Sequence, residues 1–462
     1  MLTVEKIGGT SMSRFAEVID NIIVAGQNPA EVKSRIFVVS AYGGVTNLLL
    51  EHKKNKEPGV YTLFAENRDY RAKLDEVLGA LKKINRSFAS LGLPLAEADH
   101  WVEDRVHRTA DYLESMFHVL SSGYIERSNI LLAAREMLAS IGEAHAAWNS
   151  AAILKKLGCP AVFVDLGDLD DTASLTIDER IHQALTRFDP RESLPIVTGY
   201  TKGIEGIMRA YDRGYSEITF SKIAVAVGAQ EAVIHKEFHL SSADPAVVGP
   251  GKSVIVGATN FDVADQLADV GMEAIHPRAS KPLEIAGIAL RVKNAFDPAH
   301  PGTLITRDYV SRENRLEIIT GSDQVSIVEI HDPSMVGAVG FDMDLLAVFR
   351  KHDVSYILKA TNANSISHVV WEKSVTRAFL DELAGEYAVV VDRPAAVVCA
   401  IGSNIAKPGI LVRATKALAD AGVNVLCVSQ SLRQVNMQFV VERSDYTVAV
   451  RALNEALCLS GH

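Results

Sequence analysis

Two small, glycine-rich segments near the N-terminus, each after a short apolar run, constrain the fold of this chain most strongly. The first reads Lys6-Ile7-Gly8-Gly9-Thr10-Ser11, between a strand predicted over residues 2–5 and a helix predicted over residues 12–25. The second, residues 40–47, follows the apolar run at 35–39. Two such turns, about one βα unit apart, predict an open, mainly parallel sheet that binds ligands beyond the carboxyl ends of its strands.

The first segment has the composition of a phosphate cradle. A strand delivers Lys6, the two glycines let the backbone approach a ligand closely, and the amides that open the next helix point toward an anion. A plain strand-to-helix turn with a surface lysine is the alternative, and Gly-Gly-Thr-Ser by itself favours it. The second glycine-rich segment shifts the balance toward chemistry on a phosphoryl group.

Length and charge exclude several classes of function. A chain of 462 residues predicts two or three domains with a sizeable core, and 48% hydrophobic with 23% charged residues is typical of a folded α/β enzyme. The formal net charge of -10 argues against nucleic acid or an anionic membrane as a partner, because both would be repelled. An anion site in this chain must therefore be locally basic.

The four cysteines, Cys159, Cys399, Cys427 and Cys458, are far apart and lack the paired spacing of a zinc site or a redox dithiol. We therefore expect the four cysteines to be buried free thiols that hold no metal. Free thiols fit a protein of the reducing cytoplasm. The N-terminus has no signal-like pattern, and no stretch approaches the ~20 apolar residues of a membrane span.

Up to about residue 305 short apolar runs alternate with amphipathic helices, as in βαβ units. Strands are predicted at 36–39, 161–166, 194–198, 231–235 and 289–292, and a helix at 143–157. Residues 51–125 are polar and helical and read as an inserted lid or subunit contact, with the lysine run near 52–57 as solvated surface. The proline-containing stretch 294–303 has the composition of a boundary.

The rest of the chain contains a repeat. Residues 325–360 and 395–430 share the order strand, glycine-containing turn, helix, strand. The pattern predicts two small α+β units after the sheet domain.

Three residues carry the predicted chemistry. Lys6 is placed to neutralise charge on a transferring phosphoryl group, which is the main need of a loose transition state. Glu143, at the predicted start of a helix, is either an acid that caps the helix dipole or a carboxylate that binds an ammonium. Arg213 either binds a carboxylate through two parallel hydrogen bonds or is a surface residue.

Together these segments resemble the aspartate kinases over the whole chain. The shared motifs, in the family's order, are at 6–11, 40–47, 140–143, 212–217, 274–278, 294–304, 422–425 and 429–430. The resemblance implies an α/β amino-acid-kinase domain at 1–305, with the helical insertion at 51–125, followed by two α+β ACT domains. The first, 323–390, is inserted into the second, 306–322 plus 391–462, whose opening strand is 314–321.

The resemblance also implies the activity. Such enzymes transfer the γ-phosphoryl group of ATP, with Mg²⁺, to the β-carboxylate of L-aspartate, and we expect a homodimer or higher oligomer formed through the ACT domains. No general base is required, because the acceptor carboxylate is already ionised near neutral pH.

Matched motif by motif, the family's site residues fall into three groups in this chain. The catalytic group is Lys6, Gly9 and Arg213. The aspartate group is Ser40, Thr46, Glu143, Arg213 and Ser216, with Glu143 holding the ammonium and Arg213 the α-carboxylate. The nucleotide group is Lys6, Gly8, Gly9, Ser11, Lys236 and Asp244. No metal ligand is implied by these matches.

Three departures from the family pattern lie on the nucleotide side. Tyr215 replaces a glycine of Gly-Arg-Gly-Gly-Ser-Asp, His235-Lys236 replaces Thr-Asp, and Glu273 replaces a lysine. Lys236 either supplies the missing positive charge or is a surface lysine.

Two finer expectations follow. Residues 234–245 resemble the divergent aspartate kinases associated with ectoine synthesis. In lysine-sensing relatives acidic side chains on the second ACT strand hold the effector, whereas this chain has Ile357 and Lys359 there, so we expect weak or absent inhibition by lysine. Alternatively, both ACT units serve dimerisation alone.

Two other functions stay open. One is an amino-acid-sensing regulatory protein with a degenerate kinase domain, against which the retention of Lys6, Glu143 and Arg213 argues. The other is a kinase of the same fold for another acceptor, such as glutamate or a nucleotide, which leaves the paired ACT units unexplained.

Overall fold

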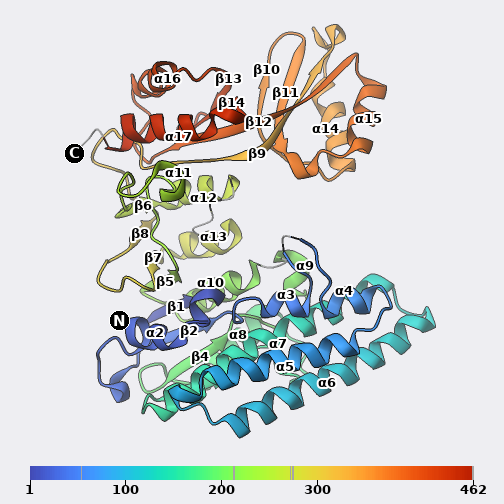
Figure 1. The fold of residues 1–462 in the computed structure, drawn as a ribbon, viewed down its shortest axis with the longest axis vertical. Coiled ribbons are helices and arrows are strands. Elements are labelled where there is room, and N and C mark those ends of the chain that lie inside the picture. Colours follow the sequence, from blue (N-terminus) through green and yellow to red (C-terminus); the bar gives the residue numbers. More distant parts are fainter. Residues whose placement is uncertain (54, 212–213, 271, 273–274, 460–462) are drawn as a thin grey trace. The chain divides into compact units, whose positions relative to one another are not determined.

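The computed structural model describes residues 1–53, 55–211, 214–270, 272 and 275–459. The chain forms two compact units, which are described separately: residues 1–239 with 278–302, and residues 240–277 with 303–462. Figure 1 labels their helices and strands.

The first unit contains six parallel strands in the order β3-β4-β2-β1-β5-β7. Their bounds are β1 Thr3–Ile7, β2 Arg35–Val39, β3 Ala161–Val164, β4 Leu194–Thr198, β5 Glu231–Lys236 and β7 Ala289–Asn294. The predicted parallel sheet is thus confirmed. Several strand ends differ from the prediction: β3 ends at Val164, β7 continues to Asn294, and Lys6 lies inside β1, opposite Val38 and Ile234, and not in the turn after it.

Nearly continuous apolar runs form these strands because helices cover the sheet and bury both faces. All five residues of β4 are buried, as are the last four of β2. Helix α7 (Arg127–Lys156) packs against β2, β3 and β4, and α10 (Tyr215–Ala226) packs against β1, β2 and β5. Alanines at 139, 144, 146, 147 and 151 of α7 are buried and allow close packing.

Two helix predictions need correction. The helix expected at 12–25 is broken into α1 (Gly9–Met12), α2 (Phe15–Val18) and a π-helical turn at Ile19–Ile23. The helix expected at 143–157 begins much earlier, at Arg127, so Glu143 lies in the middle of α7. A helix-capping role for Glu143 is therefore excluded.

The region 51–125 is helical, as predicted. Its helices are α4 (Val60–Ala65), α5 (Arg71–Ser87) and α6 (Leu95–Ser122). The remaining α-helices of this part of the chain are α3 (Val45–Leu49), α8 (Ile177–Leu185), α9 (Ile207–Tyr211) and α13 (Pro277–Ala286). In the part of the chain that the structure describes, no helix combines the length and apolarity needed to cross a membrane.

The second unit contains a short parallel pair and a six-stranded antiparallel sheet. The pair is β6 (Ala258–Asn260) with β8 (Thr303–Thr306), near α11 (Pro245–Val248) and α12 (Phe261–Asp269). The sheet has the order β10-β11-β9-β12-β14-β13. Its strands are β9 Ile318–His331, β10 Tyr356–Thr361, β11 Ser365–Trp371, β12 Val389–Ile401, β13 Val425–Gln430 and β14 Asn436–Glu442.

The long strands β9 and β12 pair along their length and divide the sheet into two similar halves. In each half a glycine with positive φ starts the first helix: Gly340 (φ 89°) before α14 (Phe341–Lys351) and Gly409 (φ 92°) before α16 (Ile410–Asp420). Glycine adopts this left-handed conformation without the steric cost that a Cβ brings. The predicted repeat of strand, glycine turn, helix and strand is therefore present.

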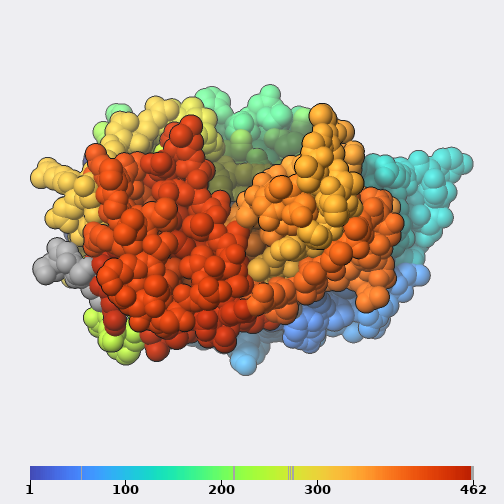
Figure 2. All heavy atoms as spheres, turned by 90° about the horizontal axis from the view of Figure 1, so that it is seen from above, coloured from blue at the N-terminus to red at the C-terminus, as the bar shows by residue number. Residues whose placement is uncertain are grey.

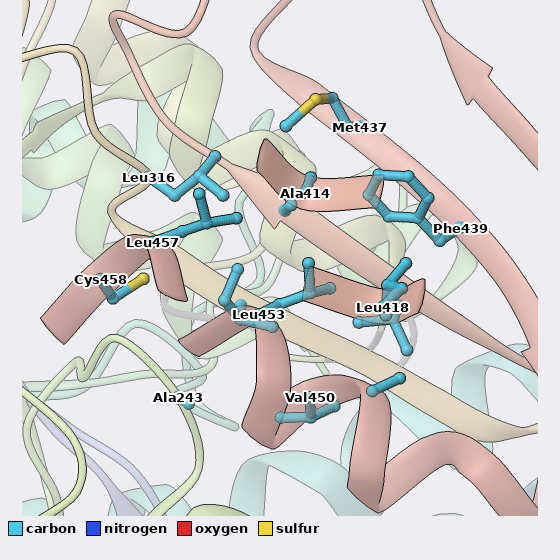
Figure 3. Packing of buried hydrophobic residues seen from close by; sticks show 14 of the residues in the cluster. Ala243, Leu316, Ala414, Leu418, Met437, Phe439, Val450, Leu453, Leu457 and Cys458 are labelled. Atoms are coloured by element: carbon cyan, nitrogen blue, oxygen red, sulfur yellow. The ribbon is translucent and has the colours of Figure 1, made fainter. Parts of the chain in front are cut away.

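Each half has its own core. Val328, Phe349, Phe379 and their neighbours fill the first, beneath α14 and α15 (Arg377–Glu386). The second core, drawn in Figure 3, lies between β12, β14, α16 and α17 (Tyr446–Asn454) and includes Phe439. In Figure 2 the two halves form adjoining lobes, orange and red.

Candidate active site

Several predicted site residues, together with Gly199, lie at the carboxyl ends of neighbouring strands in the first unit. Lys6 is the fourth residue of β1, Ser40 directly follows β2, Gly199 directly follows β4, and Lys236 ends β5. Carboxyl ends of parallel strands meet at one edge of a sheet, where ligands of such folds bind. The topology β4-β2-β1-β5 therefore assembles a single candidate site.

Two lysines share one carboxylate oxygen in this site. Glu217 Oε1 lies 3.7 Å from Lys6 Nζ and 3.7 Å from Lys236 Nζ. The Lys6 and Lys236 side chains are 10% and 18% exposed, so solvent screens their charges less than at the surface. Two cations around one anion leave a net positive charge, which suits a phosphate ligand.

Gly9 lets the two glycine-rich segments come close together. A Cβ on Gly9 would lie 2.4 Å from the carbonyl oxygen of Ala41, a distance that no side chain tolerates. A Cβ on Gly8 would have Glu237 Oε1, at 3.7 Å, as its nearest neighbour, which is an ordinary van der Waals distance. Close backbone approach is thus required at Gly9, next to Ser40.

The start of α1 already carries an anion. The backbone N–H and the hydroxyl of Ser11 donate hydrogen bonds of 3.0 and 2.9 Å to Glu237 Oε1. A phosphate at this amide must displace the Glu237 carboxylate. The expected contact between Ser11 and the nucleotide stays a prediction.

Glu143 and Ser216 form a buried pair next to Lys6. The Ser216 hydroxyl donates a 2.5 Å hydrogen bond to Glu143 Oε1, while Glu143 Oε2 has no hydrogen-bond partner among the described residues. Burial raises the pKa of Glu143 to about 8. The Ser216 hydrogen bond, the Lys6 charge and the Ala41 backbone each lower this pKa, but their effect is smaller than that of burial. The free carboxylate oxygen and the raised pKa suit a site that awaits a cation.

Gly199 packs closely against that oxygen. A Cβ at this position would lie 2.9 Å from Glu143 Oε2 and 2.8 Å from the Cβ of Ser216. A side chain here would therefore displace Glu143 or Ser216.

His235, one of the departures from the family pattern, has a role in the core. Its Nε2 lies 2.8 Å from Glu5 Oε2, and Arg35 donates two hydrogen bonds to the same carboxylate. Burial by itself would raise the pKa of Glu5, but the Arg35 charge and the His235 hydrogen bond hold it well below the usual range. The structure therefore gives His235 a buried hydrogen-bond contact with Glu5 between neighbouring strands.

Two other predicted residues, Thr46 and Asp244, lie at the starts of helices and not at strand ends. Asp244 belongs to the second unit, where its carboxylate accepts from the Ala246 amide and caps α11. Thr46 lies in the first turn of α3 and is half-buried. Arg213 and Glu273 lie outside the described residues.

Sequence reasoning missed Glu217, Gly199, Tyr200 and Glu136 as site residues. Glu217 had a signal, because an acid follows Ser216 where the family pattern has Ser-Asp. Gly199 and Tyr200 follow β4 at the same sheet edge as Ser40, so the strand-end rule predicts them as well. Glu136 lies on α7 and became visible only through its tertiary contacts.

No group of three or more His, Cys, Asp or Glu side chains within the described ranges is arranged to hold a metal ion. Mg²⁺ usually keeps several waters and binds through one or two carboxylates plus substrate phosphates. The residues of the site fit an ion that arrives with the nucleotide.

Comparison with known proteins gives concordant results. A model of the amino acid kinase family matches residues 1–294, and an ACT domain model matches residues 398–457. The chain is 46% identical to the aspartate kinase Ask_Ect of Stutzerimonas stutzeri over 99% of its own length and 97% of the relative's. It is 29% identical to the chloroplastic aspartokinase 1 of Arabidopsis thaliana over 99% of its own length and 80% of that protein's.

Among solved structures, E. coli aspartokinase III in complex with aspartate and ADP has a TM-score of 0.72. The two chains are 21% identical, and the match covers 99% of this chain and 100% of the other. At this identity the similarity establishes the fold, including the paired ACT architecture.

Proposed function

Because this chain belongs to the aspartate kinase family, within the amino acid kinase family, we propose that it transfers the γ-phosphoryl group of ATP to the β-carboxylate of L-aspartate. The observation that carries the proposal is the joining of Lys6 to Glu143 in one buried site, where the Lys6 charge acts on the pKa of Glu143. In this proposal Lys6 binds phosphate and Glu143 binds the ammonium of the amino acid.

The chemistry requires two anions to meet. An oxygen of the aspartate β-carboxylate attacks the γ-phosphorus, the bond from phosphorus to the ADP oxygen breaks, and ADP leaves. Lys6 and Lys236 offset the negative charge on the transferring group, and Glu217 holds both ammonium groups in place. No side chain needs to remove a proton, because the attacking carboxylate is ionised.

The amino acid is held at its other end. The free Oε2 of Glu143 accepts from the α-ammonium, and the hydrogen bond from Ser216 fixes the carboxylate in that orientation. By family resemblance Arg213 binds the α-carboxylate, and Ser40 and Thr46 adjoin the substrate. These roles, and the nucleotide contacts of Gly8, Gly9, Ser11, Lys236 and Asp244, are proposals.

Mg²⁺ accompanies ATP in this proposal. It supplies positive charge at the phosphate oxygens and is coordinated mainly by them and by water. Glu237 directly follows Lys236 and accepts hydrogen bonds from Ser11. In this proposal the Glu237 carboxylate leaves Ser11 when the nucleotide binds.

Four finer statements complete the proposal. We assign the kinase domain to 1–305 and the ACT domains to 323–390 and to 306–322 plus 391–462. We infer a homodimer or higher oligomer formed by the ACT domains, a cytoplasmic location in keeping with four cysteines that form no disulfide bond in the described part of the chain, and a product that feeds ectoine synthesis. Resemblance at residues 234–245 and to Ask_Ect supports the last point.

ATP-dependent hydroxamate formation tests the activity. Purified protein is incubated with ATP, Mg²⁺, hydroxylamine and either aspartate, glutamate or no acceptor. We expect hydroxamate with aspartate alone. Product with glutamate instead would support a kinase for another acceptor, and no product with any acceptor would support a regulatory protein with a degenerate kinase domain.

A further inference from the structure

Glu136 makes two hydrogen bonds that the proposed reaction does not use directly. It lies two helical turns before Glu143 on α7. Its Oε2 accepts from the Tyr200 hydroxyl at 2.8 Å, and its Oε1 accepts from the Met208 backbone N–H at 2.6 Å. A carboxylate is costly to bury without such partners, so this placement indicates a specific task.

The hydrogen bond from Tyr200 connects Glu136 with the Ser216–Glu143 pair, which is the proposed ammonium site. Tyr200 follows Gly199, and its ring contacts the ring of Tyr215 edge to face, with centroids 5.9 Å apart. Tyr215 immediately precedes Ser216, the donor to Glu143. Glu136, Tyr200, Tyr215, Ser216 and Glu143 therefore form a closed path that both begins and ends on α7.

Tyr200 borders a cavity. Its side chain is buried, and a cavity of about 360 Å³ adjoins it, lined in part by Met116, Leu132 and Ile204. The hydrogen bond from its hydroxyl adds to the packing that orients the ring on the side of this cavity. Burial raises the pKa of both Tyr200 and Glu136, so the hydroxyl keeps the proton that it donates.

The second hydrogen bond acts on the segment that leads to Arg213. Met208 lies in α9, which runs to Tyr211, two residues before Arg213. Gly206 brings the backbone close, because its φ is +73° and a Cβ there would lie 3.1 Å from Glu136 Oε1. Arg278 Nη1 donates to the Ala210 carbonyl at 2.5 Å near the other end of α9.

We propose that Glu136 is a positioning residue for the acceptor amino acid. Through Tyr200 and Tyr215 it orients the Ser216–Glu143 pair for the α-ammonium, and through the Met208 amide it anchors α9. The same geometry accounts for Tyr215, the bulky residue in place of the family's glycine, as the link between Tyr200 and Ser216. The inference rests on the proposed aspartate kinase function.

Steady-state kinetics of four variants test the inference: Tyr200→Phe, Glu136→Ala, Glu136→Gln and the double variant Glu136→Ala/Tyr200→Phe. We expect Tyr200→Phe to raise KM for aspartate about threefold to tenfold, and Glu136→Ala about tenfold or more, because one and two hydrogen bonds are lost. KM for ATP should stay within about twofold. Glu136→Gln should be close to wild type, since its amide can accept from Met208 and donate to the Tyr200 oxygen.

Two comparisons separate positioning from stability. The double variant should have the same KM for aspartate as Glu136→Ala, because Tyr200 acts through Glu136. The control is Tyr446→Phe, which removes a tyrosine hydroxyl that donates to the Gly321 carbonyl in the second unit and should lower Tm without changing either KM.

Unchanged KM for aspartate in Tyr200→Phe and Glu136→Ala, or an equal rise of both KM values, would overturn the inference. If Glu136→Ala does not fold, Tyr200→Phe decides alone. A wild-type enzyme without aspartate-dependent turnover would instead refute the proposed function, so the two failures are distinguishable.

Discussion

The Ser216 hydroxyl donates a 2.5 Å hydrogen bond to one carboxylate oxygen of Glu143 and leaves the other without a partner among the residues described. The pair is buried, and the unpartnered oxygen lies beside Gly199, where a Cβ would come within 2.9 Å of it. A carboxylate in this state is ready for an ammonium group, and the ammonium of an amino acid is the ligand that the proposed reaction provides.

Aspartate binding should release a proton from Glu143. Its pKa is about 8 in the free protein, so the carboxyl is mostly protonated at pH 7, and an ammonium beside it favours the ionised form. We expect nearly one proton released per site at pH 7 and much less at pH 9, measured by calorimetry in buffers of different ionisation enthalpy.

Glu143→Gln should bind aspartate more weakly and release no proton from this position. Equal heats in all buffers for the wild type at pH 7 would contradict the assignment of Glu143 to the ammonium.

The same group should lower the stability of the fold as pH rises. The folded-state pKa of about 8 is above the ordinary value of 4.5, so the unfolded chain loses this proton first. The destabilisation is absent below about pH 4, grows between pH 4.5 and 8, and is then constant. Glu143→Gln should therefore gain about 2–4 kcal/mol relative to wild type between pH 4.5 and 8, as measured by urea unfolding.

A matched control is Glu386→Gln, an exposed acid of α15. Its stability difference from wild type should be nearly independent of pH. A Glu143→Gln difference that is equally flat would show that Glu143 is ionised in the free fold.

Lys6→Ala should remove catalysis rather than binding. The ammonium next to Glu217 offsets charge that develops on the transferring phosphoryl group, so we expect kcat to fall by about 10²–10³-fold or more. The Kd for aspartate should change little. Lys222→Ala is the control, because this lysine of α10 pairs with Asp178 and should leave kcat unchanged. Retention of wild-type kcat in Lys6→Ala would exclude the assigned role.

Lysine should inhibit weakly or not at all. The strand that carries acidic side chains in lysine-sensing relatives has Ile357 and Lys359 in β10. Lys359 Nζ already lies 2.6 Å from Asp342 Oδ2 in the first turn of α14, so the chain's own ammonium occupies this carboxylate. Activity assays with low millimolar lysine should give the uninhibited rate, and clear inhibition would refute the expectation.

The sequence predicted those parts of the fold that depend on local pattern. Strand β4 has the predicted bounds, and the apolar runs at 35–39 and 231–235 became β2 and β5, whose ends carry Ser40 and Lys236. Because carboxyl ends of parallel strands gather at one edge, the grouping of Ser40 and Lys236 at one edge followed from these runs. The repeated strand, glycine, helix and strand order likewise predicted the two halves of the antiparallel sheet.

What remained hidden depends on contacts between distant segments. Helix α7 is buried around most of its circumference near Glu143, so it shows no amphipathic period from which its start could be read. The helix also has no side-chain cap at Glu126. Glu136 and Tyr200 are 64 positions apart, and only the folded structure places the carboxylate on the hydroxyl.

A crystal structure with ADP and L-aspartate tests the central claim most directly, namely that Lys6 and Glu143 serve one site. The account predicts the aspartate α-ammonium within hydrogen-bond distance of Glu143 Oε2, with its β-carboxylate directed toward the terminal phosphate and Lys6 Nζ. Aspartate bound away from Glu143, or a nucleotide whose phosphates do not approach Lys6, would contradict it.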